Sequence, residues 1–133
     1  MRKNGILNQD ILAATGGLGH GDYLVVSDAG LPIPLEVDRI DLTVVKNLPR
    51  FIDVLKPILA EIIVEKMILA TEIQKASPEL TAQIRELAGS IPIEFISHEQ
   101  FKALTHDAKA IVRTGEHTPY SNVILQSGVD FSK

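Results

Sequence analysis

The stretch LGHGDYLVVSDAGLPIP, residues 18–34, decides the fold of this chain. Its middle, YLVVS at residues 23–27, is a short apolar run bounded by GHGD on one side and DAG on the other. Such a run predicts a β-strand that is buried on both faces, as in the centre of a sheet. His20 is then expected on a glycine turn before this strand, and Asp28 at its carboxyl end.

Helix signals and strand signals alternate along the rest of the chain. Helix starts are recognised by their capping residues, as in the capping box of Ser97 with Gln100 three residues later. Within the second helix, Pro57 should produce a kink or an end soon after the first turns. The predicted helices begin after Asn8, at Pro49, after Ser77 and after Ser97.

The remaining apolar runs predict strands over residues 39–45, 91–97, 108–114 and 122–127. Residues 62–70 are rich in β-branched side chains, which favours a strand, although the spacing of Glu and Lys leaves a helix open. This alternation predicts an α/β fold with helices flanking a central sheet. We expect a mixed sheet, because a short, turn-like loop joins the last two strands.

The composition bounds the possible functions. The 133 residues, 45% of them hydrophobic, fit a single compact domain over residues 1–133. A formal net charge of -4 disfavours nucleic acid and anionic membranes as partners. The chain has no cysteine, which is compatible with a reducing cytoplasm. Because the first residues do not form a signal peptide and no apolar run approaches the ~20 residues of a membrane span, a cytoplasmic location is expected.

His20 and Asp28 are the first candidate site residues. The glycines on either side of His20 permit the close approach of a ligand, and loops held by a rigid scaffold are where sites are built. The same glycines can also make a tight turn without further function. Asp28 is likewise either a site residue or an ordinary turn residue that binds its own backbone.

A second group of candidates lies further along the chain. His98 and Lys102 are four residues apart on a predicted helix, so both project from one face toward a common ligand or toward solvent. Tyr120 and Asn122 stand at the entrance to a strand, where their side chains point the same way. A phenol and an amide offer uncharged donors and acceptors of the kind that hold sugar hydroxyls, unless the tyrosine simply packs on the core.

Other kinds of site are disfavoured. His106 is expected in a polar turn. A metal site made of His20, His98 and His117 lacks a second ligand at short spacing from any of the three, so no metal is expected. The glycines of TGGLGHGD, residues 15–22, precede a strand instead of following one, which excludes a nucleotide phosphate cradle.

The blocks LNQDI, LGHGDYLVVSDAGLPIP, RIDL, HEQFK and RTGEHTPYSNVIL follow one another across nearly the whole chain. In these blocks the chain resembles the ribose pyranase and fucose mutarotase family, and its ribose-specific members most closely. The resemblance implies an isomerase that interconverts the pyranose and furanose rings of ribose without cofactor or metal. It further implies a ring-shaped homo-oligomer, a decamer for the ribose enzyme, with sites completed across subunit contacts.

The same resemblance implies roles for individual residues. His20 would be the catalytic acid, and His117 falls at a position that the family pattern leaves open. The residues expected to contact the sugar are Asp28, His98, Lys102, Tyr120 and Asn122.

This chemistry fits the residue types. Opening a cyclic hemiacetal requires a proton delivered to the ring oxygen while another leaves the anomeric hydroxyl, and a histidine, which titrates near neutral pH, can perform both transfers. Asp28 would either orient the imidazole of His20 or bind a sugar hydroxyl. Two alternatives stay open: a non-enzymatic sugar-binding protein accessory to ribose uptake, and a fucose mutarotase.

Overall fold

A six-stranded sheet forms the centre of the computed structural model, which describes residues 1–132. The strands are β1 (Tyr23–Ser27), β2 (Asp38–Asp41), β3 (Val64–Ala70), β4 (Ile93–Ile96), β5 (Ala108–Arg113) and β6 (Val123–Ser127), in the spatial order β2-β5-β1-β6-β3-β4. β6 runs antiparallel to both of its neighbours, and the other pairs are parallel. The predicted mixed sheet is therefore confirmed.

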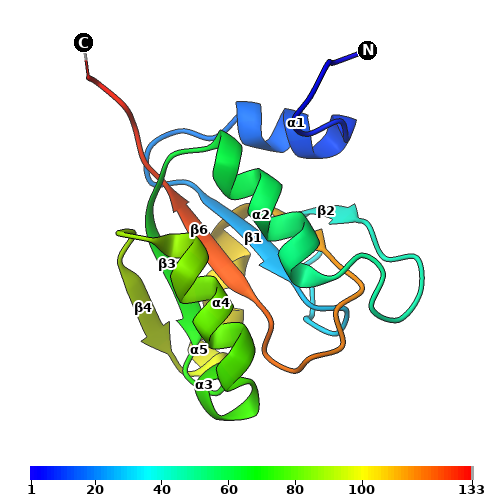
Figure 1. Cartoon of the computed structure of the whole chain (residues 1–133), viewed down its shortest axis with the longest axis vertical. Coiled ribbons are helices and arrows are strands. Elements are labelled where there is room, and N and C mark those ends of the chain that lie inside the picture. Colours follow the sequence, from blue (N-terminus) through cyan, green and yellow to red (C-terminus); the bar gives the residue numbers. More distant parts are fainter. Residues whose placement is uncertain (133) are drawn as a thin grey trace.

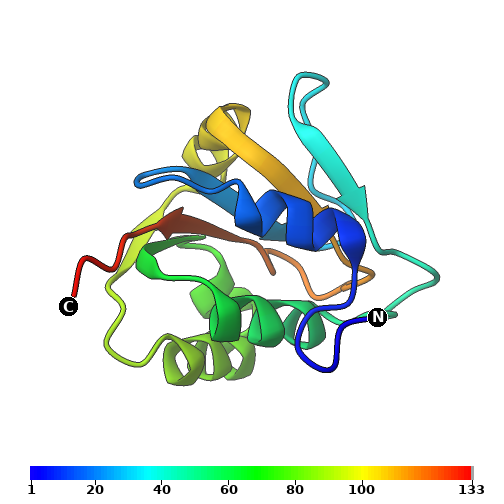
Figure 2. The same ribbon diagram turned by 90° about the horizontal axis from the view of Figure 1, so that it is seen from above.

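Helices cover both faces of this sheet (Figure 1). They are α1 (Gln9–Gly16), α2 (Phe51–Glu61), α3 (Ile73–Ala76), α4 (Pro78–Ala88) and α5 (His98–Leu104), which is followed by the 3-10 turn η1 (Thr105–Asp107). α1, α2 and α4 pack on one face and α5 on the other (Figure 2). Leu24 and Val26 of β1 belong to the core on the first face, and Val25 to the core on the second. β1 is thus buried on both faces, as predicted.

The predicted helix starts at three positions are confirmed by their caps. The side chain of Asn8 accepts a hydrogen bond at the start of α1, and that of Ser77 does so at the start of α4. Ser97 and Gln100 form the reciprocal capping box of α5, whose first residue is His98. Each cap satisfies backbone donors that the first helical turn leaves without a partner.

Pro57 lies inside α2, which continues for one more turn and ends at Glu61. The proline is on the exposed side, whereas Phe51, Leu55 and Ile58 are fully buried against the sheet. Burial of side chains of this kind contributes ~1.5–3 kcal/mol each, which offsets the roughly 3 kcal/mol that proline costs inside a helix.

Three other elements differ from the sequence predictions or decide between them. The strand expected over residues 39–45 ends earlier, at Asp41, because the chain then turns and the Thr43 hydroxyl donates to the Thr114 carbonyl at 2.8 Å. Residues 62–70, left open between strand and helix, contain β3. The four-residue α3 was not predicted, since it is too short to show a helical period.

The topology brings five connecting segments, one after each of β1 to β5, to one edge of the sheet. β1 to β5 all run in one direction, so their carboxyl ends meet at this edge, where open α/β sheets bind their ligands. Residues 114–122 leave β5, cross over the end of β1 and enter β6. The Ala29 N–H after β1 donates to the Glu116 carbonyl in this crossing loop at 2.9 Å.

No helix within residues 1–132 is both long and apolar enough to cross a membrane.

Candidate active site

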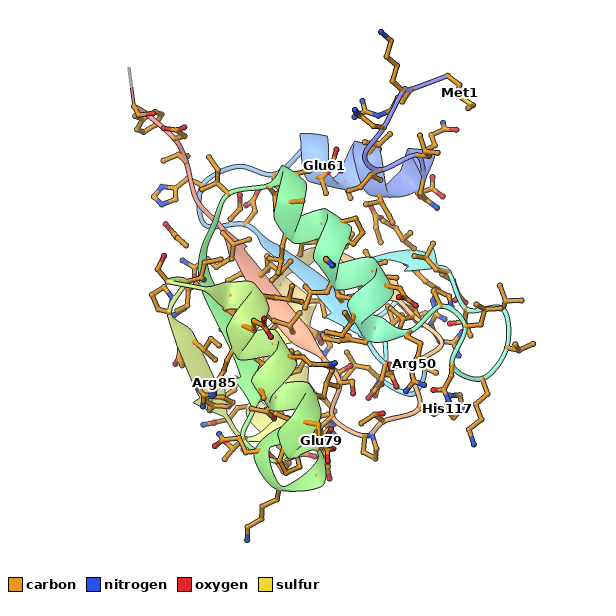
Figure 3. All side chains as sticks on the ribbon, in the orientation of Figure 1. Met1, Arg50, Glu61, Glu79, Arg85 and His117 are labelled. Atoms are coloured by element: carbon orange, nitrogen blue, oxygen red, sulfur yellow. The ribbon has the colours of Figure 1, made fainter. Side chains whose placement is uncertain are left out.

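A cavity of about 520 Å³ opens at the carboxyl edge of the sheet. Its walls come from the turn after β1, the loop after β2, the start of α5 and the loop between β5 and β6. Figure 3 shows Arg50 and His117 at this end of the molecule, with Met1 and Glu61 at the opposite end. Three of the predicted site residues, Asp28, His98 and Tyr120, line the cavity. Its size is within the range typical of small-molecule sites.

Asp28 is fixed by Asn122 and by its own turn. The Asn122 amide oxygen accepts the Asp28 N–H at 2.8 Å, and its amide nitrogen donates to Oδ2 of Asp28 at 3.2 Å. Oδ1 of Asp28 accepts the N–H groups of Gly30 and Leu31 at 3.0 and 2.9 Å. Burial raises the pKa of Asp28 despite these bonds. Asp28 is therefore a turn residue and a cavity residue at once, and the fully buried Asn122 supports it from behind.

His98 and Tyr120 form a second wall. Their rings meet edge to face at 5.1 Å between centroids, and the ring of Phe101 stacks on that of His98 at 6.4 Å between centroids. Nδ1 of His98 is buried and has no hydrogen-bond partner within residues 1–132. A buried N–H without an acceptor is costly, so we assign the proton to Nε2. Tyr120 has a φ of 62°, a backbone conformation that is costly for an aromatic residue and is typical of functional sites.

Besides Lys46, the sequence reasoning missed two charged residues that line the cavity, Arg113 and Glu116. Nε of Arg113 donates to the Ala29 carbonyl at 3.0 Å, and its Nη1 pairs with both oxygens of Asp41 at 3.2 and 3.0 Å. Arg113 thus ties the turn after β1 to the end of β2. The signal that could have found both residues is a pair of charged side chains at the end of a buried strand.

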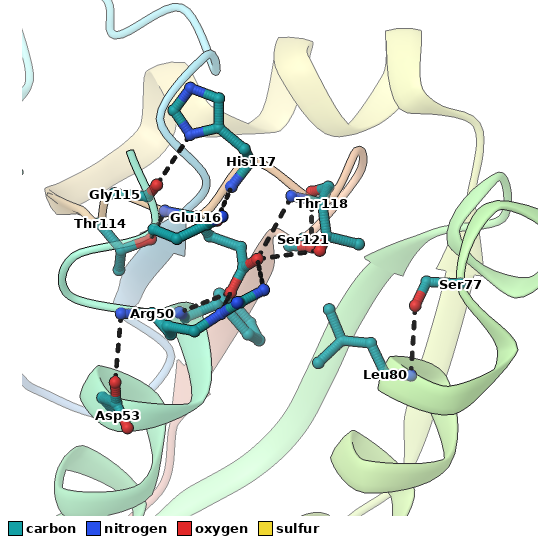
Figure 4. Close-up of polar contacts among 12 residues, drawn as sticks. Arg50, Asp53, Ser77, Leu80, Thr114, Gly115, Glu116, His117, Thr118 and Ser121 are labelled. Carbon is teal, nitrogen blue, oxygen red and sulfur yellow. Dashed lines mark hydrogen bonds and ion pairs between the residues drawn. The ribbon is translucent and has the colours of Figure 1, made fainter. Parts of the chain in front are cut away.

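Glu116 ties the crossing loop to the start of α2 (Figure 4). Its carboxylate accepts from Nε and Nη2 of Arg50 at 3.2 and 2.8 Å and from the Phe51 N–H at 3.1 Å. The Thr118 hydroxyl donates to it at 2.9 Å. Burial alone would raise the pKa of Glu116, which is only 3% exposed, but the bonds from Arg50, Phe51 and Thr118 outweigh burial and lower the pKa to about 2. The loop that carries Tyr120 is thereby held by a buried anion.

His20 lies at the opposite edge of the sheet from the cavity of its own chain. The five residues of β1 separate it from Asp28, which at ~3.3 Å per residue is a strand length of roughly 16 Å. The glycine turn does not fold back, because the Gly21 N–H donates to the Ser127 carbonyl at the end of β6 at 2.8 Å. Nε2 of His20 lies 3.0 Å from Oε2 of Glu65, and the side chain of His20 is 61% exposed.

The remaining candidates occupy other places. Nζ of Lys102 pairs with Glu99 at 2.8 Å, and Lys102 lines a separate cavity beside His106. Nδ1 of His106 in turn pairs with Glu36 at 2.6 Å. His117 lies at the mouth of the main cavity, with Nδ1 at 2.9 Å from the Gly115 carbonyl. Within residues 1–132, no three side chains of His, Cys, Asp or Glu gather closely enough to hold a metal ion.

Comparison with known proteins identifies relatives over nearly the whole chain. The model of the RbsD / FucU transport protein family matches residues 1–130. A D-ribose pyranase from Geobacillus kaustophilus (strain HTA426) is 50% identical over 132 residues, which cover 99% of this chain and 97% of that protein. A D-ribose pyranase from Clostridium perfringens (strain SM101 / Type A) is 50% identical over 131 residues, covering 98% of this chain and 100% of that protein.

Two solved structures extend this comparison. The structure of Bacillus subtilis RbsD complexed with D-ribose has a TM-score of 0.95 and 47% sequence identity, covering 98% of this chain and 100% of that chain. The fucose mutarotase in complex with L-fucose from Streptococcus pneumoniae has a TM-score of 0.72 and 26% identity, covering 93% and 94% of the two chains.

Proposed function

The chain belongs to the RbsD / FucU transport protein family, and from this premise we propose that it is an isomerase that interconverts the pyranose and furanose forms of D-ribose. The observation that carries the proposal is the cavity at the carboxyl edge, where Asp28, His98 and Tyr120 converge. Their carboxylate, imidazole and phenol can accept and donate hydrogen bonds to several hydroxyls of one small sugar. The near full-length similarity to D-ribose pyranases supports the same substrate.

The reaction needs two proton transfers and no cofactor. A proton goes to the ring oxygen as the bond from that oxygen to the anomeric carbon breaks, and the anomeric hydroxyl loses a proton to give the open aldehyde. Attack by a different hydroxyl then closes the other ring by the reverse transfers. General acid–base catalysis of this kind typically supplies ~10²–10⁴-fold. We assign the delivery of the first proton to His20.

His20 has to reach the sugar from another copy of the chain. The turn that carries His20 precedes β1 and is hydrogen-bonded to the end of β6, whereas Asp28 follows the carboxyl end of β1. Asp28 of the same chain therefore cannot orient His20, and we assign it the binding of a sugar hydroxyl. Lys102 lies outside the main cavity of its own chain, so we propose that any contact it makes with ribose is also to the site of another copy.

Association of copies fits an exposed apolar surface beside the cavity. Val44, Val45 and Leu48, in the loop after β2, are 71%, 60% and 52% exposed. Val45 also lines the cavity, so a neighbour that covers this loop would lie next to bound sugar. A ring-shaped decamer and a cytoplasmic location stay predictions from the sequence and its resemblance.

Saturation-transfer NMR of ribose ring exchange tests the proposal. We expect the wild-type protein to accelerate exchange between the pyranose and furanose forms, and His20→Ala to lose most of that acceleration while still binding ribose. Wild-type exchange in His20→Ala would remove His20 from the mechanism. Ribose binding without accelerated exchange in the wild type would instead identify a sugar-binding protein, and faster exchange of L-fucose than of ribose would identify a fucose mutarotase.

A further inference from the structure

We infer that Glu65 is a positioning residue for His20, which it holds so that Nδ1 is the nitrogen that exchanges a proton with the sugar. The inference rests on the proposed function only in taking His20 as the proton donor. The contact that carries it is the 3.0 Å distance between Nε2 of His20 and Oε2 of Glu65. Because a carboxylate accepts hydrogen bonds, the neutral imidazole keeps its proton on Nε2 and leaves the lone pair on Nδ1.

Glu65 is itself fixed by its strand and by a neighbour. The pairing of β3 with β6 is irregular between Val64 and Lys66, so Glu65 lies at a local break in the ladder. Irregularities of this kind re-aim a side chain and are common next to active sites. The second carboxylate oxygen, Oε1, accepts from the amide nitrogen of Gln126 on β6 at 2.6 Å. Both oxygens of Glu65 are thus engaged, one by Gln126 and one by His20.

The backbone around His20 is also held in place. The Gly19 N–H donates to Oδ2 of Asp22 at 2.8 Å, and the Gly21 N–H donates to the Ser127 carbonyl at 2.8 Å. Gly21 has a φ of +85°, which a residue with a side chain adopts only under strain. With the main chain fixed on both sides, the contact with Glu65 decides which edge of the imidazole faces outward.

Two carboxylates lie close to His20. Glu65 faces it from β3, and Asp22 lies on its own loop. The nearest cation along β3, Lys66, is paired with Glu94 at 2.8 Å. The bonds from Gln126 and from His20 lower the pKa of Glu65, so the carboxylate is charged throughout the neutral range. A fixed carboxylate beside an imidazole both orients the ring and stabilises the imidazolium.

The test compares Glu65→Gln with the wild-type protein in two measurements. The first is the ¹⁵N NMR spectrum of the neutral His20 ring, which reports the nitrogen that carries the proton. We expect the neutral ring of the variant to become a mixture of both tautomers, because the Gln side chain can either accept or donate a hydrogen bond. The second is the pH profile of ribose ring exchange. Exchange should slow at least about twofold at neutral to basic pH, where an imidazole is uncharged and can take either tautomer, while the ribose dissociation constant stays within about twofold.

Glu36→Gln is the matched control, because Glu36 forms the same kind of pair with His106 on another part of the surface. It should leave both the tautomer of His20 and the pH profile unchanged. Gln126→Ala keeps the carboxylate and frees only Oε1 of Glu65, so a smaller change in the tautomer of His20 is expected.

An unchanged tautomer of His20 in Glu65→Gln would overturn the inference. Equal loss of exchange at every pH, with His20 unaffected, would also overturn it and indicate a structural role. Failure of the proposed function is distinguishable, since it appears as a lack of ring exchange in the wild type, whereas the NMR spectrum still reports the effect of Glu65 on the tautomer of His20.

Discussion

Glu116 provides a quantitative test of how the walls of the cavity are held. Its pKa is lowered from 4.5 to about 2, which means that the folded protein stabilises the charged carboxylate. Each unit corresponds to 1.36 kcal/mol, so the shift represents up to about 3 kcal/mol of folding free energy at pH 7. The carboxylate is 3% exposed, but the side chain of Arg50 is 52% exposed, and solvent screening of Arg50 reduces this figure to about 2–3 kcal/mol.

The sign of the pH dependence follows from the direction of the shift. Because the pKa is lower in the folded state, the contribution of Glu116 is fully present above pH 4.5 and is lost as the pH falls toward 2. The substitution Glu116→Gln removes the charge and leaves the N–H groups of Arg50 and Phe51 facing a poorer acceptor. We expect the variant to be about 2–3 kcal/mol less stable than wild type at pH 7, with the difference shrinking by about 2 kcal/mol between pH 5 and pH 3.

Urea unfolding at pH 7, 5 and 3, at one protomer concentration, measures this difference. Glu86→Gln, a substitution of the same type on the exposed side of α4, serves as the control and should change stability by less than about 0.5 kcal/mol. A difference between wild type and Glu116→Gln below about 1 kcal/mol at pH 7 would refute the reasoning. So would a difference that stays the same at all three pH values.

Three further substitutions test the surroundings of the site. Gly115→Ala should lower the free energy of unfolding by about 1–3 kcal/mol in thermal unfolding, because a Cβ there would lie 2.6 Å from the Leu48 carbonyl oxygen. The control Gly16→Ala should change it little, because a Cβ at Gly16 has nothing within 4 Å. Ser77→Ala should cost about 1 kcal/mol through loss of the α4 cap, measured by urea unfolding, and should leave ring exchange unchanged. Asn122→Ala removes both hydrogen bonds to Asp28, so it should lower the free energy of unfolding by about 1–3 kcal/mol. It should also weaken ribose binding in calorimetry, because the Asp28 turn is no longer held. Unaltered ribose affinity would contradict that role of Asn122.

Local signals in the sequence were sufficient for most elements of the fold. The apolar run of β1 and the caps at Asn8, Ser77 and Ser97 are decided by residues a few positions apart, and the structure confirms each of them. How far α2 continues past Pro57 depends on how much apolar surface the helix buries against the sheet. That quantity depends on tertiary packing, which local propensity does not contain.

The site was harder to predict than the fold, for a geometric reason. Asp28 and Tyr120 could be singled out by residue type and loop position, and the crossing of residues 114–122 over β1 brings them together. Glu116 was missed because its importance comes from burial next to Arg50, which is 66 positions away in the chain. The single chain places His20 at the opposite edge of the sheet, so the role that we propose for it requires a second copy of the chain.

The central claim, that one site combines the cavity of one copy with His20 of another, is tested most directly by mixing two defective variants. His20→Ala and Asp28→Ala are each expected to lose ribose ring exchange when purified alone. Co-expressed with different tags and isolated as mixed oligomers, they should regain about a quarter of wild-type exchange, because about one site in four then receives an intact His20 and an intact Asp28 from different copies. Mixed oligomers with no more exchange than the separate variants would contradict the shared site.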